Sequence, residues 1–425
     1  MIKVAIIGVG TVGSSVANIL KKNAKIIEAR SGKKIVPVIG VVKNLNKKRD
    51  VDIELTDDIN EVLDRDDIDI YIELMGGVEN AYNVVKKILK KGKTVITANK
   101  ALLAYHRYEL QQEARVLDTS IGIEASVAGG IPVVKALREG LSANQILAIK
   151  GIINGTCNFI LSKMMNEKAN FKHTLEEAQK LGYAEADPTF DVGGFDTAHK
   201  LLILASIAYG VDAKPEDILI EGIENISPED IYFANDFEYN IKLLGIAKKI
   251  GKKVELRVHP ALVPKDKMLA KVDGVMNGVS IVGDSVGETM YYGAGAGGDA
   301  TASAVIADII DIVREDKSSP MLGYIYSPDK EKLTLMPQKD IETKYYVRVK
   351  VKDEIGVLAK ISKLLQEHKI SVDSFLQKPE IKENDYTTLF FSTHTCKESD
   401  IQKALEKIAN LEFMLEKPMI IRIED

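Results

Sequence analysis

The sequence has few of the features that mark secreted or membrane-bound proteins. Only two cysteines, Cys157 and Cys396, occur in 425 residues. They are too few for a disulfide framework, so we expect a reducing compartment. The longest apolar run, near Leu201, is far shorter than the ~20 residues of a membrane-spanning helix. The N-terminus, MIKVAIIGVG, has no signal-peptide cleavage site. We therefore expect a cytoplasmic protein that does not bind membranes.

The sequence also lacks an excess of basic charge and a recognisable zinc-ligand pattern. Its net charge is −5, which argues against nucleic acid as the main partner. The six histidines and two cysteines show no zinc-ligand spacing. What remains is an ordinary globular composition, 45% apolar and 28% charged. The chain is long enough for about three domains.

A glycine-rich turn follows the first apolar segment. Residues 2–7, IKVAII, form a continuous apolar run typical of a buried parallel strand, and GVGTVG comes directly after it. In this spacing the first glycine makes a tight turn and the second lets the backbone approach a pyrophosphate. The third lets the following helix pack against the strand. The predicted dinucleotide-binding residues are Gly8, Gly10, Thr11, Val12 and Gly13.

The end of the second predicted strand, residues 35–42, indicates which dinucleotide binds. NAD-preferring sites usually place an acid there for the ribose hydroxyls, but this chain has Lys43 and then the basic run 47–49. Basic residues suit a 2′-phosphate, so we predict NADP, with NAD as the alternative. Lys43 is the candidate phosphate ligand, and a solvated charge run on a loop is the alternative interpretation of residues 47–49.

Another predicted strand, residues 93–99, ends at a lysine. Lys100 follows it directly, and ligands bind along this carboxyl edge in open α/β sheets. A lysine with no such role is disfavoured at a helix start, because a cation there opposes the helix dipole. We therefore expect Lys100 to contact the cofactor or the substrate.

The glycines of residues 293–298 precede a long apolar helix in the sequence. We predict that Asp299 or Thr301 caps this helix and that it returns to close the nucleotide domain. Gly295 and Gly297 would then lie near the nicotinamide. A flexible turn is the alternative interpretation of the same glycines.

The stretch 181–204, LGYAEADPTFDVGGFDTAHKLLIL, concentrates acids ahead of one lysine. Asp196 and Lys200 are four residues apart and share one face of a helix. The apolar run after Lys200 predicts that this helix is buried. A proline and two glycines interrupt any helix before Asp196, so Glu185 and Asp191 are expected on a loop. The alternative is a helix N-terminus with a favourable acidic first turn.

The segment GIINGTCNFILSKM, residues 151–164, reads as strand, turn and helix. Its turn places Asn154, Gly155 and Thr156 where they can offer amides and a hydroxyl to a small polar ligand. The next predicted helix is expected to begin at a capping box formed by Thr174 and Glu177.

Residues 252–292 contain short β segments, VELRVHPALV, GVSIVG and ETMYYG. We therefore expect the middle of the chain to form an α+β domain with its own sheet.

Several of these stretches together resemble the homoserine dehydrogenase family over nearly the whole chain. One such match could arise by chance, but six in the family's order are specific. They are GVGTVG at residue 8, TANK at 97, EASVAGGIP at 124, NGTCN at 154, LGYAEADPTFDVGGFDTAHK ending at residue 200, and GAGAGG at 293.

The resemblance implies reversible hydride transfer between NAD(P)H and L-aspartate 4-semialdehyde, which gives L-homoserine. This reaction is the branch point toward threonine, methionine and isoleucine. A lysine ammonium can stabilise the developing alkoxide and supply its proton. The family's proton-donating lysine falls on Lys200, with Asp196 beside it. Its substrate-binding residues fall on Glu185, Asp191, Tyr183, Gly155 and Thr156, and its cofactor contacts include Thr97 and Lys100.

Members of the family also hold a sodium ion on backbone oxygens. The resemblance carries this site to Glu124, Val127, Gly129 and Ile131. Backbone carbonyls are ligands that side chains do not encode, so no spacing in the sequence points to this site independently of the resemblance.

From residue 343 the pattern restarts as strand, helix, strand, strand, helix and strand. This βαββαβ order is the ferredoxin-like unit, and it resembles an ACT domain. Asp353, Ile355 and Gly356 then lie in the turn where members bind amino acids. ACT domains usually pair through their sheets, so a homodimer or homotetramer is expected. Feedback by threonine is the functional interpretation, and a dimerisation module without a ligand is the alternative.

The predicted organisation has three folded parts and one linker. Residues 1–130 and 293–318 form a doubly wound, Rossmann-type NAD(P) domain of α/β class. Residues 131–292 form the α+β substrate and dimerisation domain, residues 319–342 a linker, and residues 343–425 the ACT domain.

Two other functions stay open from the residues alone. Cys157 follows a glycine turn at a helix start that would lower its pKa, which would suit an acylating semialdehyde dehydrogenase. No histidine lies close to Cys157 in sequence to serve as its base. A non-catalytic, NADP-linked sensor of amino acids is the third hypothesis.

Overall fold

A computed structural model describes residues 1–167, 169–315, 319–326, 333–377 and 386–424. Parts of the predicted nucleotide domain and linker, residues 316–318 and 327–332, lie outside the described residues. The chain divides into two compact units, which we call unit 1 and unit 2. Unit 1 comprises Met1–Gly155, Asp196–Asp217 and Met276–Leu333; unit 2 comprises Thr156–Phe195, Ile218–Val275 and Thr334–Asp425.

Unit 1 contains a six-stranded, wholly parallel sheet in the order β3-β2-β1-β4-β5-β6. The strand order reverses between β1 and β4, which is the doubly wound arrangement whose ligands bind at that switch point. The predicted Rossmann-type fold is therefore confirmed. Its strands are β1 (Ile2–Ile7), β2 (Ile35–Val41), β3 (Glu54–Thr56), β4 (Ile70–Glu73), β5 (Thr94–Thr97) and β6 (Ile121–Gly122).

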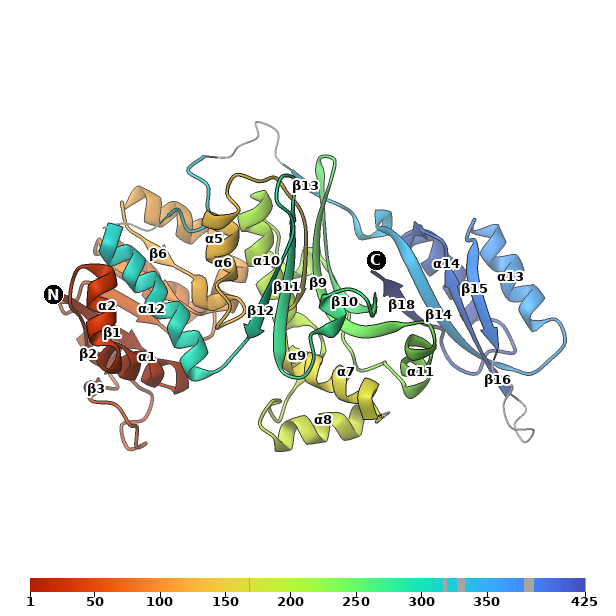
Figure 1. The fold of residues 1–425 in the computed structure, drawn as a ribbon, viewed down its shortest axis with the longest axis horizontal. Coiled ribbons are helices and arrows are strands. Elements are labelled where there is room, and N and C mark those ends of the chain that lie inside the picture. The colour runs from red at the N-terminus through yellow and green to blue at the C-terminus, as the bar shows by residue number, and fades with distance from the viewer. Residues whose placement is uncertain (168, 316–318, 327–332, 378–385, 425) are drawn as a thin grey trace. The chain divides into compact units, whose positions relative to one another are not determined.

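One face of this sheet is covered by α1 (Thr11–Lys22), α2 (Ala24–Ser31) and the returning α12 (Gly298–Glu315), which lie together in Figure 1. Apolar side chains of these helices pack on β1, β4 and β5 in one buried cluster. The predicted return helix is thus correct, but its cap is not. The helix already begins at Gly298, so Asp299 and Thr301 lie in its first turn. The other helices are α3 (Ile59–Leu63), α4 (Glu79–Lys90) and α5 (Lys100–Val116).

Unit 1 also contains three antiparallel strands and a buried helix. The strands β7 (Ile146–Ile152), β11 (Met276–Gly283) and β12 (Gly287–Ala294) pair in the order β12-β11-β7. Helix α10 (Phe195–Tyr209) is buried on nearly every side, as its apolar run predicts. Short turns complete the unit: η1 (Glu124–Ser126), α6 (Val133–Lys135), the π-helix η2 (Ala136–Gly140) and η3 (Pro215–Asp217).

Unit 2 is built on a long antiparallel pair, β9 (Tyr239–Ile250) and β10 (Lys253–Pro264). Two short strands, β8 (Leu219–Ile220) and β13 (Thr334–Leu335), run parallel to β10. The strands β10, β11 and β12 confirm the β structure predicted for residues 252–292. The helices are α7 (Gly155–Glu167), α8 (Phe171–Lys180), α9 (Thr189–Val192), α11 (Pro228–Asp236) and η4 (Leu269–Lys271).

The predicted capping box at Thr174 is wrong. The cap lies four residues earlier: α8 begins at Phe171, and Asn170 caps it by accepting a hydrogen bond from the His173 backbone. Thr174 therefore lies inside the helix, where its hydroxyl donates to the carbonyl of Asn170. Asn is as good an N-cap as Thr, so the earlier cap adds a full turn to the helix.

The C-terminal part of unit 2 has the predicted βαββαβ order. Its four main strands pair as β18-β14-β16-β15. Two helices pack on this sheet through one apolar cluster (Figure 1). Strand β18 also pairs in parallel with β10, so the C-terminal sheet joins the rest of unit 2. The elements are η5 (Gln338–Asp340), β14 (Glu342–Lys352), α13 (Val357–Glu367), β15 (Val372–Gln377), β16 (Tyr386–Thr393), β17 (Cys396–Lys397), α14 (Glu398–Ala409) and β18 (Met419–Ile423).

Candidate active site

The glycine-rich turn after β1 has the geometry that its spacing predicts. Gly8 has a φ of +109°, and a Cβ there would lie 2.6 Å from the Leu74 carbonyl oxygen. A Cβ at Gly13 would lie 2.4 Å from the Gly8 oxygen, so only glycine lets α1 pack this closely on the strand. Gly10 precedes α1 and provides no side-chain cap. The first amides of α1, from Thr11 onward, can therefore donate to a phosphate.

Arg49, which the sequence left open between a phosphate ligand and a solvated charge run, lies against this turn. Arg49 is half-buried, and its Nε donates to the Val9 carbonyl oxygen over 2.8 Å. Its Nη1 donates to the carbonyls of Asn44 and Lys47 over 2.9 and 2.8 Å. Arg49 is therefore held against the glycine-rich turn that follows β1. Lys43, the predicted phosphate ligand, is an exposed residue just after β2.

The glycines before α12 form a packed turn beside the same helix. A Cβ at Gly298 would lie 2.7 Å from the Ser15 hydroxyl of α1, and one at Gly295 would overlap the Asn277 side chain. Gly297 has a φ of +123°. This close packing favours the cofactor-side interpretation over a flexible turn, although contact with the nicotinamide stays a prediction.

Lys200 lies at the centre of a polar cluster in unit 1. Its Nζ donates to the Ile153 carbonyl oxygen over 2.7 Å and to Asp196 Oδ2 over 2.8 Å. Asp196 Oδ2 also accepts from the Asn154 amide over 2.9 Å, and its Oδ1 lies 3.1 Å from the Lys100 Nζ. Only 13% of the Lys200 side chain and 5% of that of Asp196 are exposed. The predicted helical pair is therefore real, and Lys100 joins it.

The charges in this cluster are fixed by their neighbours. Burial alone would raise the pKa of Asp196, but the ammonium groups of Lys200 and Lys100 outweigh burial and hold that pKa below its usual value. Burial lowers the pKa of the adjacent His199 to about 4. At neutral pH the histidine is neutral, so the cations at this position are the two lysines.

A second buried acid lies at the end of β4, and sequence interpretation missed it. Glu73 is fully buried; it accepts from the Thr97 hydroxyl over 2.6 Å and from the Met75 backbone over 2.9 Å. Burial raises its pKa. The Thr97 hydroxyl thus donates its proton to Glu73. A contact between Thr97 and the cofactor, as predicted, would therefore be made by the Thr97 backbone.

Four of the remaining predicted substrate residues, Thr156, Tyr183, Glu185 and Asp191, belong to unit 2, whereas Gly155 belongs to unit 1. The Thr156 hydroxyl, at the start of α7, donates to the Tyr183 carbonyl oxygen over 2.6 Å. Glu185 lies on an exposed loop as predicted, whereas Asp191 lies in the four-residue helix α9. The Sγ of Cys157 donates to the Asp191 carbonyl oxygen over 3.2 Å. Two hydrogen bonds therefore join the segment that contains Tyr183 and Asp191 to the start of α7.

The turn between β14 and α13 borders a pocket of about 420 Å³. Gly356 has a φ of +90° and precedes the helix, and Ile355 is fully exposed. Asp353 and Gly356 line this pocket, with Thr387 of the neighbouring strand β16. The three residues predicted for an effector therefore lie on one turn.

Comparison with known proteins identifies this arrangement. A family model of homoserine dehydrogenase matches residues 132–310, a model of the homoserine dehydrogenase NAD-binding domain matches residues 8–124, and an ACT-domain model matches residues 345–413. A homoserine dehydrogenase of Helicobacter pylori is 53% identical over 424 residues, which cover 100% of this chain and 99% of that one. The chain belongs to the homoserine dehydrogenase family. It is an oxidoreductase with a C-terminal ACT domain, as the motifs predicted.

Solved structures of the family agree with the fold. A homoserine dehydrogenase from Thiobacillus denitrificans is 42% identical, with a TM-score of 0.93 over 100% of this chain and 98% of its own. A hyperthermophilic archaeal homoserine dehydrogenase in complex with NADPH is 27% identical, with a TM-score of 0.63 over 73% of this chain and 97% of its own. A nicotinamide cofactor is therefore supported. No helix among the described residues is long and apolar enough to cross a membrane.

The family membership bears on the two alternative functions. Cys157 has no exposed surface, and its thiol is hydrogen-bonded to a backbone carbonyl. A nucleophilic thiol must reach its substrate, so an acylating mechanism through Cys157 does not fit this geometry. A non-catalytic sensor is disfavoured by the full-length similarity to enzymes.

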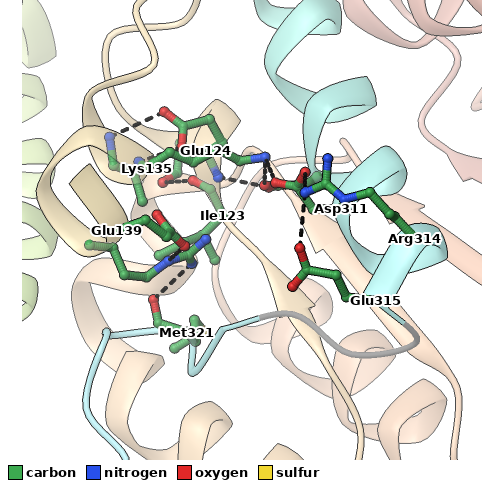
Figure 2. Close-up of polar contacts among 12 residues, drawn as sticks. Ile123, Glu124, Lys135, Glu139, Asp311, Arg314, Glu315 and Met321 are labelled. Atoms are coloured by element: carbon green, nitrogen blue, oxygen red, sulfur yellow. Dashed lines mark hydrogen bonds and ion pairs between the residues drawn. The ribbon is translucent and has the colours of Figure 1, made fainter. Parts of the chain in front are cut away.

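A buried acidic cluster supports the segment that the family resemblance links to sodium (Figure 2). The Glu124 carboxylate accepts from the backbones of Val134 and Lys135 over 3.1 and 2.7 Å. The backbone N–H of Glu124 donates to the Asp308 carboxylate over 2.9 Å. Burial, and then the charge of Asp308, raise the pKa of Glu124 to about 7. Lys135 also contacts Asp308, at 3.3 Å, and Asp311 of α12. These contacts tie η1 and α6 to the return helix.

Proposed function

We propose that this protein catalyses the reversible NADP-dependent reduction of L-aspartate 4-semialdehyde to L-homoserine, in threonine, methionine and isoleucine biosynthesis. The observation that carries the proposal is the Lys200 ammonium. Two of its three N–H bonds are used by Ile153 and Asp196, which leaves a third for a substrate oxygen. A bound nicotinamide supplies the hydride. Lys200 then stabilises the developing alkoxide and gives it a proton.

The other residues bind and orient the reactants in this proposal. Asp196 provides the counter-charge of Lys200 and fixes its direction. The substrate's α-ammonium needs acids, which Glu185 and Asp191 provide. The amides at the start of α7, at Gly155 and Thr156, suit its carboxylate.

The experiment that tests the function is a direct assay. The purified protein is mixed with L-aspartate 4-semialdehyde and NADPH, and the loss of cofactor absorbance is followed. Product is identified as homoserine by chromatography. If NADPH is not consumed while the protein demonstrably binds it, the proposed reaction is wrong.

We propose NADP as the preferred cofactor, with Arg49 and Lys43 as the cations for its 2′-phosphate. A charged hydrogen bond contributes about 1.5–3 kcal/mol, so Arg49→Ala should raise the KM for NADPH roughly 10- to 100-fold. The KM for NADH should change far less, because NADH has no 2′-phosphate. Lys43→Ala should act in the same direction, and the exposed Lys48→Ala serves as a matched control. Equal losses with both cofactors would mean that Arg49 only supports the glycine turn.

We also propose a sodium ion on the backbone oxygens of Glu124, Val127, Gly129 and Ile131. The tight turn here, with φ of 55° at Ala128 and 41° at Gly129, suits a carbonyl site. The Ile131 carbonyl oxygen also accepts a hydrogen bond from the Val133 backbone, so this oxygen would bind the ion and the Val133 N–H together. The ion would be structural, because a monovalent cation on carbonyls adds little to a hydride transfer.

We propose that threonine inhibits the enzyme through the ACT turn and that the protein is a homodimer or homotetramer. Strand β15 ends the sheet order and exposes Val372 and Phe375, which supports pairing between ACT sheets. Asp353→Asn should raise the threonine concentration for half-inhibition by at least ~10-fold, because a charged contact to the effector's ammonium is lost. Turnover without threonine is the reference for each variant. Unchanged inhibition would move the effector site away from this turn.

A further inference from the structure

A buried arginine in the last strand joins two acids from distant segments of unit 2. Arg422 is fully buried in β18. Its Nε and Nη2 donate to the Glu398 carboxylate over 2.9 and 2.6 Å. Its Nη1 and Nη2 donate to Glu221 over 2.6 and 3.0 Å. Two bidentate pairs hold one guanidinium in a single orientation.

Glu398 fixes one side of this network inside the ACT domain. It begins α14, and its carboxylate also accepts from the Tyr345 hydroxyl and the Gln402 amide, each over 2.8 Å. Burial favours the neutral acid, but the hydrogen bond and charge of Arg422 outweigh burial and lower the pKa of Glu398. Glu398 therefore fixes the Arg422 side chain within the ACT domain, and the guanidinium moves when that domain moves.

Glu221 lies on the other side, just after β8. Its backbone N–H donates to the Val258 carbonyl of β10 over 2.8 Å. The C-terminal strand pairs with the same β10 a few residues further on, with Arg422 opposite Ala261. The end of β8 and the end of β18 thus share one edge of β10, and the Glu221–Arg422 pair connects them.

The segment after β8 is in direct backbone contact with the acidic segment. The Ile223 N–H donates to the Val192 carbonyl oxygen over 2.9 Å. A Cβ at Gly222 would lie 2.4 Å from the same oxygen, and one at Gly194 would lie 3.3 Å from the Glu221 oxygen. The two backbones are therefore in direct contact at this point, so we expect a shift of residues 221–223 to move Val192 and its neighbour Asp191.

We propose that Glu221 and Arg422 are positioning residues through which the ACT domain holds Asp191 in its place for substrate binding. An amino acid bound to the ACT domain then alters substrate affinity by moving this link. The inference rests on the proposed substrate role of Asp191. Neither Glu221 nor Arg422 touches a reacting atom, so their effect falls on KM and on effector response rather than on the chemical step.

Glu221→Gln in the full-length protein tests the link. The Glu221 side chain is 35% exposed, and Arg422 keeps Glu398 as a counter-charge in this variant. We expect the KM for aspartate semialdehyde to rise roughly 2- to 30-fold and threonine inhibition to weaken by a similar factor. The affinity for NADPH should stay at the wild-type value. Glu412→Gln is the matched control, because it removes an exposed ACT carboxylate that lies 3.4 Å from Lys360.

Hydrogen exchange at the Ile223 amide provides a readout that does not need turnover. We expect faster exchange in Glu221→Gln than in the wild type, and a change when threonine is added to the wild type. Glu221→Asp, which keeps the charge but shortens the reach, should give a smaller effect and replaces Glu221→Gln if that variant does not fold. A lower melting temperature with unchanged KM, inhibition and exchange would overturn the proposal. If the wild type consumes no NADPH, the proposed reaction fails, whereas the exchange data still decide the link.

Discussion

Replacing Lys200 by alanine is expected to lower kcat by roughly 10²- to 10⁴-fold, the usual contribution of a general acid. The Lys200 side chain is 13% exposed, and its ammonium is held by Ile153 and Asp196. Its removal takes away both the proton and the positive charge that stabilises the alkoxide. The affinity for NADPH, measured by fluorescence titration, should be close to that of the wild type. This pattern is the signature of an interaction made only in the transition state.

Lys200→Arg separates the two contributions of the lysine. Arginine keeps the positive charge but does not give up a proton at any ordinary pH. We therefore expect a kcat well below that of the wild type and somewhat above that of Lys200→Ala. Near-normal kcat in both variants would remove Lys200 from the mechanism. Near-normal kcat in the arginine variant alone would assign it a purely electrostatic role.

The contact between Asp196 and Lys200 was predictable from the sequence because both residues lie on one helix. Asp196 and Lys200 are four residues apart on a helix, so their contact follows from helical spacing alone. The partners that complete the cluster come from elsewhere in the chain. Asn154 and Lys100 were each proposed as ligand contacts, but no pattern in the sequence says that both reach the same carboxylate.

The residues missed by the sequence interpretation share a physical reason. Arg49 sits in a basic run that is indistinguishable from a solvated loop until the loop is folded onto Val9. Glu73 is one acid within an apolar strand, and its distant partner Thr97 becomes a neighbour only when β4 and β5 pair in register. Arg49 and Glu73 each contact a residue that is more than 20 positions away in the sequence, so no local pattern reveals the contact.

The fold shows the same division between local and distant signals. The parallel strands of unit 1 were predictable because they are buried on both faces and read as continuous apolar runs. Strand β9 was not, because its apolar residues Leu243, Ile246 and Ile250 have the three- and four-residue spacing of a helix. Its long pairing with β10 overrides that local preference.

Asp196→Asn should have the largest effect on stability, because it removes the only negative charge in contact with both Lys100 and Lys200 among the described residues. Breaking one side of a buried ion pair costs about 3–5 kcal/mol. The folded protein holds the pKa of Asp196 below its usual value. Its contribution to the free energy of unfolding is therefore fully present above the unfolded pKa and is lost as the pH falls below about 4. The difference from the wild type should be constant near neutral pH and shrink in acid.

The same substitution should move the pH dependence of turnover. Without the carboxylate, two ammonium groups face each other, and like charges lower each other's pKa. Reduction needs Lys200 protonated, so the alkaline limb of kcat against pH should move to lower pH, with kcat reduced at its maximum. Asp64→Asn, which removes an 82% exposed acid 3.8 Å from Lys91, is the matched control for both measurements. An alkaline limb at the wild-type position, in an Asp196→Asn protein that is folded, would mean that Asp196 does not set the charge of the catalytic lysine.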